Sequence, residues 1–585
     1  MIIDTGQNGA RKNSSKLYTS FLLLSLFAII SNVLASTSPK TKSSHQNKAT
    51  KTLQEQSTPD QSPIDKKQMR ELKKYLSGLV QKEVQPFEKK SWKAIFKQST
   101  DAVVQIFSHL SIPDLLEPYK TPNEQLASGT GFFIDQEGHL LSNFHVVDHA
   151  KTLSIQIPSL GKERFEVEYI GGNPHRDACL LRLTDEALKS VKNKLENHTL
   201  TYLEFDDSDM LAEAQEIMVM GYPLGQENLK MALGNCSGTE SSGRGGECKQ
   251  TTAAVNPGNS GGPFLNDTGK VVGICVSKMV NVEAEGIGYL IPINNIKTIL
   301  KELFTTKICK TPYWGCTLIN TNEHTLKFLG NPCDGGVYVS SVKKESLSEQ
   351  YGLQQGDVIY AIDDKKIDHF GYLKSSWSQT KISLFDYISR LEIGSTFLVT
   401  IYRKGEKKEL TVEIKCESPF KINRYYPWYQ EPLRYEVFGG LVIVELTLNH
   451  IELFKKIANY HGVDLFSIIK YEQQENRFQP RLAVVHIIPT SQTYRTSFDH
   501  DDRIIKKVND VPVFTIDDFR NAVLLSKGKD YVTVEAEGGS FCAISLPEFF
   551  QKEDLFSNYF GYTKSSLIDE LLASDEQQEE IIAAA

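Results

Sequence analysis

The chain has 585 residues, too many for one hydrophobic core, and this length predicts roughly three or four domains. Apolar residues make up 40% and charged residues 24%, as in ordinary globular proteins, and the formal net charge is -8. This charge argues against nucleic acid as a partner and gives no reason to expect an anionic membrane surface.

The first 35 residues have the pattern of an export signal. Arg11 and Lys16 precede the apolar run Phe21–Ile30, and Val33–Ala35 supplies small or aliphatic residues of the kind that a signal peptidase reads. The run is shorter than the about 20 residues that cross a bilayer comfortably. Residues 1–35 are therefore predicted to be a signal peptide, with an uncleaved membrane anchor as the alternative. The exported protein is expected in the periplasm, or else in the extracellular space or an organelle lumen.

Residues 36–99 are predicted to be a flexible linker that contains a short helix. Residues 36–64 are mostly Ser, Thr, Lys, Gln and Pro, and they can bury too little apolar surface to fold. Within 65–83, apolar residues recur at helical spacing from Met69 to Leu79, which predicts an amphipathic helix.

Between residues 100 and 305 the sequence consists of short β-rich runs separated by Gly, Pro, Asn and Asp. Runs of this length and spacing predict a β-barrel or a β-sandwich. A helix is expected over Asn294–Phe304, after Pro292. The predicted strands are Ala102–Phe107, Gly131–Ile134, Leu153–Ile157, Glu166–Ile170, Ala178–Leu183, Ile217–Met220, Val271–Val276 and Gly288–Ile291.

Two further segments, residues 306–418 and 419–550, share one order of strand, turn, strand, helix and strand. Gly352–Ile359 in the first segment and Asp502–Ile505 in the second combine the Gly or Asp turn with an apolar strand. We interpret the two segments as related α/β modules. Residues 551–585 are predicted to form an acidic C-terminal tail.

The sharpest chemical signal is the run Asn256–Pro263, which reads N-P-G-N-S-G-G-P. A serine hydroxyl needs a base to take its proton, and the oxyanion that then forms needs backbone donors. Ser260 is the predicted nucleophile because glycines around it let the backbone approach a substrate. The oxyanion hole is assigned to the N–H groups of Gly258 and Ser260, and a plain surface turn is the alternative.

The predicted base is His145, which lies in the run Leu140–Val147. The Ser-Asn pair before it and the Val-Val pair after it fit a loop that presents the side chain at a cleft. A satisfied core histidine is the alternative. His149, His139 and His175 are weaker candidates because they lack a packed strand on one side.

Asp177 is the predicted carboxylate partner, since it stands at the mouth of the apolar run Ala178–Leu183. A carboxylate at that place carries a desolvation cost unless it is paired, and a histidine N–H would pair it. Asp148 is too close to His145 in sequence, and Asp185 lies beyond the strand. The chain order His, Asp, Ser is one of the known orders for this triad.

Several motifs resemble the HtrA/Deg family of serine proteases over residues 100–305. They are Ser128–Phe132, Ser142–Val147, Arg176–Ala178, Asn256–Pro263 and Gly286–Tyr289. The downstream modules resemble PDZ domains, and the stretch Tyr435–Thr447 is similar to the second PDZ domain of plant-type Deg proteases.

This resemblance implies a mainly β fold: a chymotrypsin-like double β-barrel protease domain followed by two PDZ-like α/β modules. It implies a serine endopeptidase that degrades unfolded or damaged exported proteins, with roles in quality control and stress response. It also implies a homo-oligomer built from trimers, and a loop over residues 108–127 that holds the oligomer together or gates the site. Unfolded or C-terminally exposed polypeptides are the expected partners.

Three features depart from the family's pattern. Thr252 stands where the family usually has an acid, and Phe144 stands where it tends to have a small residue before the histidine. The Gly/Ser-rich loop between Cys236 and Cys248 is unusual, and these two cysteines could pair across it. No cysteine or histidine spacing predicts a metal site, and no cofactor is expected.

Specificity follows from the pocket for the residue before the cut. In such a fold its floor lies six positions before the nucleophile, at Ala254, with walls near Ile274 and Ile287. An uncharged floor favours small or medium aliphatic residues. In the first module, a carboxylate-binding loop would let a peptide add as a strand, with an aromatic-rich core strand as the alternative. The residues of this loop are Tyr313, Trp314, Gly315 and Cys316.

Two competing functions remain at this point. One is a catalytically silent chaperone or scaffold that uses its PDZ-like modules, and the intact triad argues against it. The other is a lipase or esterase, which would need a strand, a sharp turn and a helix around its serine. The β-rich context and the chain order argue against that alternative.

Overall fold

The computed structural model describes residues 90–572 except for short gaps. The gaps are 242–245, 277–286, 311, 313, 379, 416–419, 462–464, 495, 497 and 499–501. The predicted signal peptide, the predicted helix over 65–83 and most of the predicted linker therefore lie outside the described residues.

The described chain begins with a helix rather than a flexible linker. Helix α3 (Trp92–Ser99) starts after Ser91, whose hydroxyl accepts a hydrogen bond from the backbone N–H of Ala94. Such a cap satisfies a backbone donor that would otherwise be left without a partner at the helix end. Ile95 on this helix is fully buried, so the compact part of the chain extends into the predicted linker.

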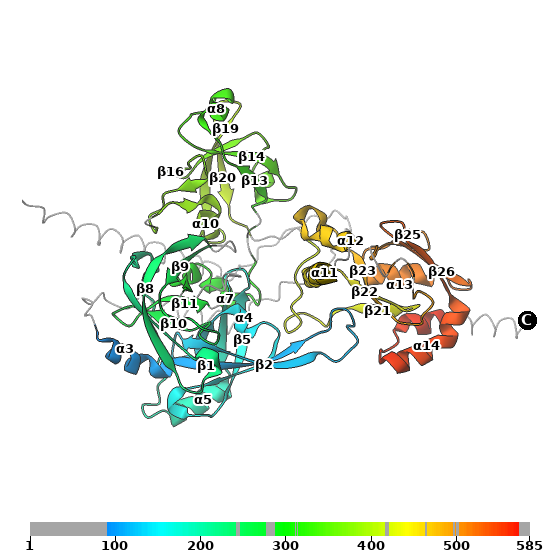
Figure 1. Ribbon diagram of the computed structural model, residues 1–585, viewed down its shortest axis with the longest axis horizontal. Helices are drawn as coiled ribbons and strands as arrows, with labels where there is room; N and C mark the ends of the chain where they lie inside the picture. The colour runs from blue at the N-terminus through cyan, green and yellow to red at the C-terminus, as the bar shows by residue number, and fades with distance from the viewer. Residues whose placement is uncertain are drawn as a thin grey trace, which may run out of the picture. The chain divides into compact units, whose positions relative to one another are not determined.

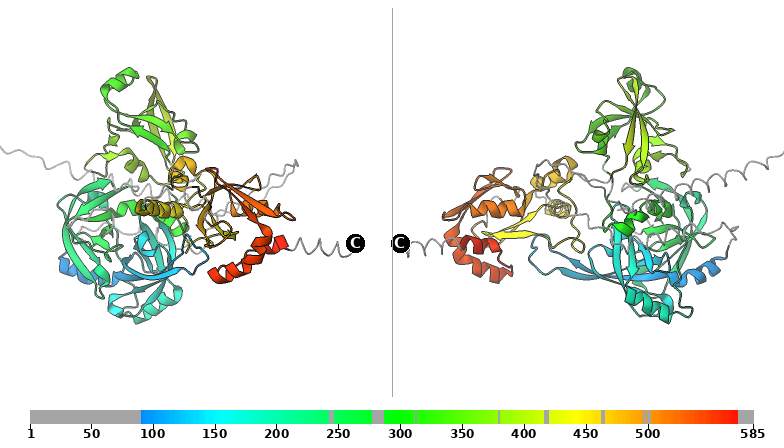
Figure 2. Two further views of the ribbon diagram at one scale, coloured as in Figure 1. Left: turned by 45° about the vertical axis from the view of Figure 1, so that its right-hand side comes forward. Right: turned by 180° about the vertical axis from the view of Figure 1, so that it is seen from behind.

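Twelve strands in the described part of the protease region form two closed six-stranded barrels. Figures 1 and 2 show this β-rich region from three directions. The first barrel has the strand order β1-β2-β3-β6-β5-β4 and the second the order β10-β11-β12-β9-β8-β7. The predicted chymotrypsin-like double β-barrel is thus confirmed. The strands of the first barrel are β1 (Val103–Ile112), β2 (Asn123–Phe133), β3 (His139–Ser142), β4 (Ala150–Gln156), β5 (Phe165–Asn173) and β6 (Ala178–Leu183). Those of the second are β7 (Glu216–Gly221), β8 (Lys230–Ser241), β9 (Glu247–Thr251), β10 (Pro263–Leu265), β11 (Val271–Val276) and β12 (Gly288–Pro292).

Two parts of this region differ from the prediction. The expected loop over 108–127 is largely a hairpin, because β1 and β2 pair without a break from Val103 opposite Phe132 to Ile112 opposite Asn123. The expected helix over 294–304 is two helices, since Ile299 leaves helical geometry at φ -109 and ψ 0. The helices of the region are α4 (Phe144–Val147), α5 (Asp185–Lys194), α6 (Ile293–Lys297) and α7 (Leu300–Thr305). Single 3-10 turns are η1 (Thr100–Ala102), η2 (Pro158–Leu160), η3 (Ser208–Met210) and η4 (Pro223–Gly225).

The first PDZ-like module is built on a sheet with the order β13-β14-β15-β19-β20, to which a short strand, β16, adds beside β15. Its elements are β13 (Cys316–Ile319), α8 (Glu323–Phe328), β14 (Val337–Val342), α9 (Leu347–Gln350), β15 (Val358–Ile362), β16 (Lys365–Lys366), β17 (Tyr372–Leu373), β18 (Ile382–Ser383), α10 (Leu384–Ser389), β19 (Thr396–Arg403) and β20 (Glu406–Glu413). β13 is an edge strand of this sheet.

The second PDZ-like module has the sheet order β21-β22-β23-β24-β26-β27, with β25 beside β24. Its strands are β21 (Tyr435–Phe438), β22 (Leu441–Glu445), β23 (Leu482–Ile487), β24 (Ile504–Val508), β25 (Val511–Pro512), β26 (Tyr531–Ala536) and β27 (Phe541–Ser545). Its helices are α11 (Leu448–His461), α12 (Phe466–Ile469), α13 (Ile516–Leu524) and α14 (Leu546–Phe560), with 3-10 turns η5 (Lys470–Glu472) and η6 (Gln474–Asn476).

The predicted start of the tail, residue 551, falls inside helix α14. Beyond that helix, Leu567, Ile568 and Leu571 are buried in the same core cluster as Phe438 and Phe519 of the second module. The acidic composition of the chain end conceals these apolar side chains. The compact module therefore continues about twenty residues past the expected boundary.

A buried ion pair stabilises the first module and can be tested directly. Asp357, which is fully buried, accepts hydrogen bonds from Arg403 Nε at 2.7 Å and Nη2 at 2.8 Å. Removing one partner of a buried pair leaves an uncompensated charge, so Arg403→Met is expected to lower the free energy of unfolding by about 3 kcal/mol. Lys407→Met breaks an exposed ion pair with Glu409 and should change the free energy of unfolding by less than about 0.5 kcal/mol. Urea unfolding measures both, and equal midpoints for the two variants would contradict the assignment.

Candidate active site

Helix α4, a single turn, carries the candidate base His145. β3 ends at Ser142, whose hydroxyl donates to the backbone carbonyl of Thr130 at 2.7 Å. Asn143 is extended, with φ -75 and ψ 147, and the helix starts directly after it. The expected loop around the histidine is therefore a strand end that turns into a helical turn.

His145 and Asp177 form a two-point contact. The ring Nδ1 lies 2.7 Å from Asp177 Oδ2, and the backbone N–H of His145 donates to Asp177 Oδ1 at 2.9 Å. Asn143 Nδ2 donates to the backbone carbonyl of Asp177 at 2.9 Å, and Asp177 has a φ of +49, which is uncommon outside glycine. With Nδ1 donating to the carboxylate, Nε2 is left to accept a proton. The side chain of His145 is 38% exposed and that of Asp177 is 26% exposed, so both side chains face solvent in part.

Ser260 lies in the turn between β9 and β10 and is 3% exposed. Its backbone carbonyl accepts a hydrogen bond from the N–H of Thr130 at 2.9 Å. The next residue, Gly261, is so close to the other barrel that a Cβ there would lie 2.2 Å from Ser142 Oγ and 3.0 Å from Asn143 N. The structure thus brings the Ser260 turn against the segment that leads into His145, from a different barrel and more than a hundred residues away.

The turn that precedes Ser260 contains the candidate oxyanion donor Gly258. Asn259 N–H donates to Asn256 O at 3.0 Å, and Gly258 has a φ of +99, which only glycine adopts readily. Thr130 Oγ1 donates to the carbonyl of Gly258 at 2.6 Å, which fixes the peptide group. Among the described residues no acceptor is found for the Gly258 N–H.

Two rival histidines also meet carboxylates. His139 Nδ1 lies 2.7 Å from Asp135 Oδ2, but its side chain is 1% exposed and packs edge-on against Phe304. His149 lies 3.1 Å from Asp148 of its own loop. Neither pair combines exposure with a serine turn beside it, which separates them from the pair at His145.

The residues assigned to the specificity pocket differ in exposure. Ala254 is exposed, and its carbonyl lies 3.5 Å from Asn259 Nδ2. Ile287 is 41% exposed, whereas Ile274 on β11 is 0% exposed. Ile274 is paired with Pro263 and Ile291 inside the second barrel, so its side chain offers no surface to a substrate in this structure.

The candidate peptide loop of the first module is only partly described, because Tyr313 lies outside the described residues. Trp314 is 8% exposed and packs on Phe397, as the core alternative expected. Gly315 has a φ of +70, and its carbonyl accepts a hydrogen bond from Lys343 N–H at 2.7 Å. Cys316 begins β13, so the loop leads into the edge strand of the sheet. In the second module, β22 follows Gly440. Unlike β13, it is paired on both sides, by β21 and β23, and is not an edge strand.

The cysteines at the unusual loop do not form a disulfide in this structure. Cys236 and Cys248 are free thiols. The ladder between β8 and β9 places Cys236 opposite Thr251 and Cys248 opposite Glu240. Cysteines several rungs apart exceed the Cα separation that a disulfide needs. Among the described residues no group of three metal-ligating side chains is found.

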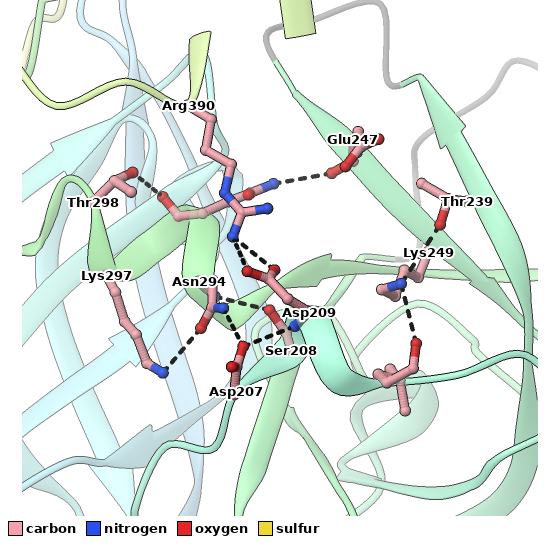
Figure 3. Close-up of polar contacts among 12 residues, drawn as sticks. Asp207, Ser208, Asp209, Thr239, Glu247, Lys249, Asn294, Lys297, Thr298 and Arg390 are labelled. Carbon is pink, nitrogen blue, oxygen red and sulfur yellow. Dashed lines mark hydrogen bonds and ion pairs between the residues drawn. The ribbon is translucent and has the colours of Figure 1, made fainter. Parts of the chain in front are cut away.

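Polar contacts join the end of helix α10 in the first module to the turn η3 of the protease region (Figure 3). Arg390, at the end of that helix, donates to both carboxylate oxygens of Asp209 at 2.6 Å. Arg176, next to Asp177, donates to Asn295 O at 2.5 Å and also to the backbone carbonyl of Ser389. The sequence predicted none of these contacts, because no local pattern marks a contact between residues more than a hundred positions apart.

Glu247 lies beside these contacts, at the start of β9. Its backbone carbonyl accepts a hydrogen bond from Asn295 Nδ2 at 3.1 Å. Burial raises the pKa of Glu247 to about 7, against the opposing positive charge of Arg390, while Asp386 raises it further. The carboxyl group therefore changes its charge near neutral pH.

Models of known families match three parts of the chain. A trypsin-like peptidase domain matches residues 129–274, and PDZ domains match residues 312–414 and 426–559. The serine protease Do-like HtrA of Bacillus subtilis is 32% identical over 310 residues, which cover 50% of this chain and 64% of that protein. The putative serine protease HhoB of Synechocystis is 30% identical over 309 residues, which cover 50% and 67%. The chain thus spans about two thirds of the length of these curated relatives. A solved structure of the HtrA-type protease AlgW with a decapeptide is 20% identical, covers 56% of this chain and 99% of that one, and has a TM-score of 0.44.

The raised pKa of Glu247 predicts a pH dependence of stability. An acid whose pKa is higher in the folded than in the unfolded state stabilises the fold at low pH, and this contribution is lost as pH rises toward about 7. Glu247→Gln should therefore flatten the fall of the melting temperature between pH 5 and pH 8. Thermal melts at half-unit pH steps measure this, with the exposed Glu186→Gln as control. A variant that melts in parallel with the wild type at every pH would refute it.

Proposed function

We propose that this chain, which belongs to the HtrA family of serine proteases, is an endopeptidase that cleaves unfolded or C-terminally exposed polypeptides outside the cytoplasm. The observation that carries the proposal is the hydrogen-bonded pair of His145 and Asp177 at 2.7 Å, with the Ser260 turn packed against the same segment. No other described histidine combines these features.

The proposed reaction is acyl transfer through a covalent intermediate. His145 Nε2 takes the proton of Ser260 Oγ as the oxygen attacks the substrate carbonyl, and Asp177 stabilises the imidazolium that forms. The N–H groups of Gly258 and Ser260 donate to the oxyanion. The imidazolium then gives its proton to the leaving amine. In the second half of the reaction, water attacks the acyl-enzyme while His145 takes its proton, and the imidazolium returns a proton to Ser260 as the acid product leaves.

The first PDZ-like module is proposed to bind polypeptide segments by strand addition. Support comes from β13, which a glycine with positive φ precedes and which lies at the edge of the described sheet, where an added strand can pair. Quality control of exported proteins suits such binding because unfolded chains expose extended apolar segments and ends. Assembly into trimers or their multiples is proposed from family resemblance.

Export to the periplasm is proposed from the predicted signal over residues 1–35, with the extracellular space or an organelle lumen as alternatives. Within the described part of the chain, no helix has the length and apolar character needed to cross a bilayer.

Two alternatives are less well supported. An esterase of the α/β-hydrolase type would place a helix after its serine, whereas strand β10 follows Ser260 here. A catalytically silent scaffold would have no need of the two-point contact between His145 and Asp177. The two remaining possibilities, protease and scaffold, are separated by the next experiment.

Ser260→Ala should reduce the hydrolysis of unfolded casein by at least about 10⁴-fold, since the covalent step is removed. Release of labelled fragments measures the rate, and Ser237→Ala on β8 serves as the matched control, with wild-type activity expected. If the wild type and Ser260→Ala hydrolyse casein equally slowly while both retain peptide binding, the chain is a scaffold and the proposal is wrong.

The pocket floor at Ala254 predicts cleavage after Val, Ala or Ile. Ala254→Asp should shift cleavage toward Lys and Arg, because a carboxylate at the floor pairs with a basic side chain. Digestion of an unfolded protein followed by mass spectrometry of the products reads both preferences, with Ser237→Asp as a control for added charge. A majority of wild-type cuts after basic residues would exclude this pocket.

A further inference from the structure

Residues 420–434, here called the strap, connect the first PDZ-like module to the second and belong to neither sheet. One end of the strap is held by the second module. Ile422 is fully buried in a core cluster of that module. Asn449 of helix α11 accepts a hydrogen bond from Tyr425 N–H at 2.8 Å and donates to Tyr425 O at 3.1 Å. These two hydrogen bonds attach the strap to helix α11.

The middle of the strap packs on the protease domain through aromatic rings. Trp428 lies 4.3 Å from Tyr169 and 6.0 Å from Phe144 between ring centroids, and Tyr426 lies 5.8 Å from Phe144. Trp428 Nε1 also donates to Asp148 Oδ1 at 3.3 Å. Aromatic pairs at such distances contribute about 0.5–1.5 kcal/mol each beyond the apolar area that they bury.

These contacts lie at both ends of helix α4. Phe144 is its first residue and Asp148 directly follows its last, so the strap touches the chain on either side of His145. One turn of helix is too short to be stable by its own hydrogen bonds, and it depends on packing for its position. The Phe144 ring packs closely against the backbone of Gly172, where a Cβ would lie 2.6 Å from Phe144 Cδ2.

The charge of Asp148 is also maintained by this contact. Burial by itself would raise its pKa, but hydrogen bonds from His149 and Trp428 and the positive charge of Arg424 outweigh burial and lower the pKa below the usual value. Arg424 belongs to the strap, so the strap supplies both a hydrogen-bond donor and a compensating cation to the carboxylate that ends α4. Phe144, the large residue that departs from the family pattern, packs against the strap residues Tyr426 and Trp428 in this chain.

We propose that the strap is a positioning element for catalysis: Trp428 and Tyr426 hold α4 so that His145 is aligned with Ser260, and the second module controls this alignment through Asn449. The proposal rests on the proposed protease function. A displacement of a catalytic group by about 1 Å costs on the order of 10²-fold in rate, so a loosened α4 reduces turnover without removing any catalytic residue.

Trp428→Ala tests the role in turnover. It should lower kcat on a short fluorogenic peptide by about 10- to 100-fold and leave KM within about twofold, because α4 is displaced while the substrate pocket is not. Trp428→Phe keeps a ring against Phe144 and should restore most of kcat. Asn449→Ala, at the other end of the strap, should lower kcat in the same direction. Tyr460→Ala removes an 85% exposed ring from α11 and is the matched control.

A second measurement does not depend on activity. In the Ser260→Ala background, Trp428→Ala should speed hydrogen exchange of the amides of residues 144–148 and leave the amides of β10 unchanged, which also excludes global unfolding. Unchanged exchange at 144–148 would overturn the strap inference. Faster exchange with unaltered kcat, or a loss that appears only in KM, would overturn the positioning role. If exchange at 144–148 is faster but the wild-type protein hydrolyses no substrate, the strap contact is confirmed and the proposed protease function is wrong.

Discussion

A single carboxylate, that of Asp177, fixes both the backbone and the ring of His145. One oxygen accepts from the backbone N–H of the histidine and the other faces its Nδ1. Both contacts require β3 and β6 to be neighbours, because Asp177 directly precedes β6 and α4 follows β3 by one residue. The pairing of Ser142 with Cys179 at the end of this ladder sets the two segments at the correct separation. The ladder between β3 and β6 therefore sets the distance between His145 and Asp177.

Thr130 extends that constraint to the second barrel. Its backbone N–H donates to Ser260 O, and its hydroxyl donates to Gly258 O while it accepts from Tyr222 N–H at 3.1 Å. Its own carbonyl accepts the hydroxyl of Ser142, two residues before α4. One residue of β2 thus ties the serine turn, the oxyanion turn and the strand that leads to His145. The two barrels cannot shift against each other without breaking bonds at the candidate site.

The first PDZ-like module and the strap contact residues that adjoin the proposed triad. Arg176, bonded to the end of α10 of the first module, precedes Asp177, and Phe144, packed against the strap, precedes His145. Each contact thus falls on the residue directly before a proposed catalytic residue.

The sequence by itself determined the parts of the candidate site that depend on local chemistry. The run around Ser260 needs glycines at fixed positions, and His145 and Asp177 each border a buried apolar strand, so short patterns are enough to predict all three, along with the β-rich character of the barrels. Only the tertiary structure decided which segments meet. The strap, the contact of Arg176 with α10 and the core that continues to Leu571 join residues far apart in the chain. Their energy comes from packing and hydrogen bonds formed only after folding, and such contacts leave no periodicity or spacing in the sequence.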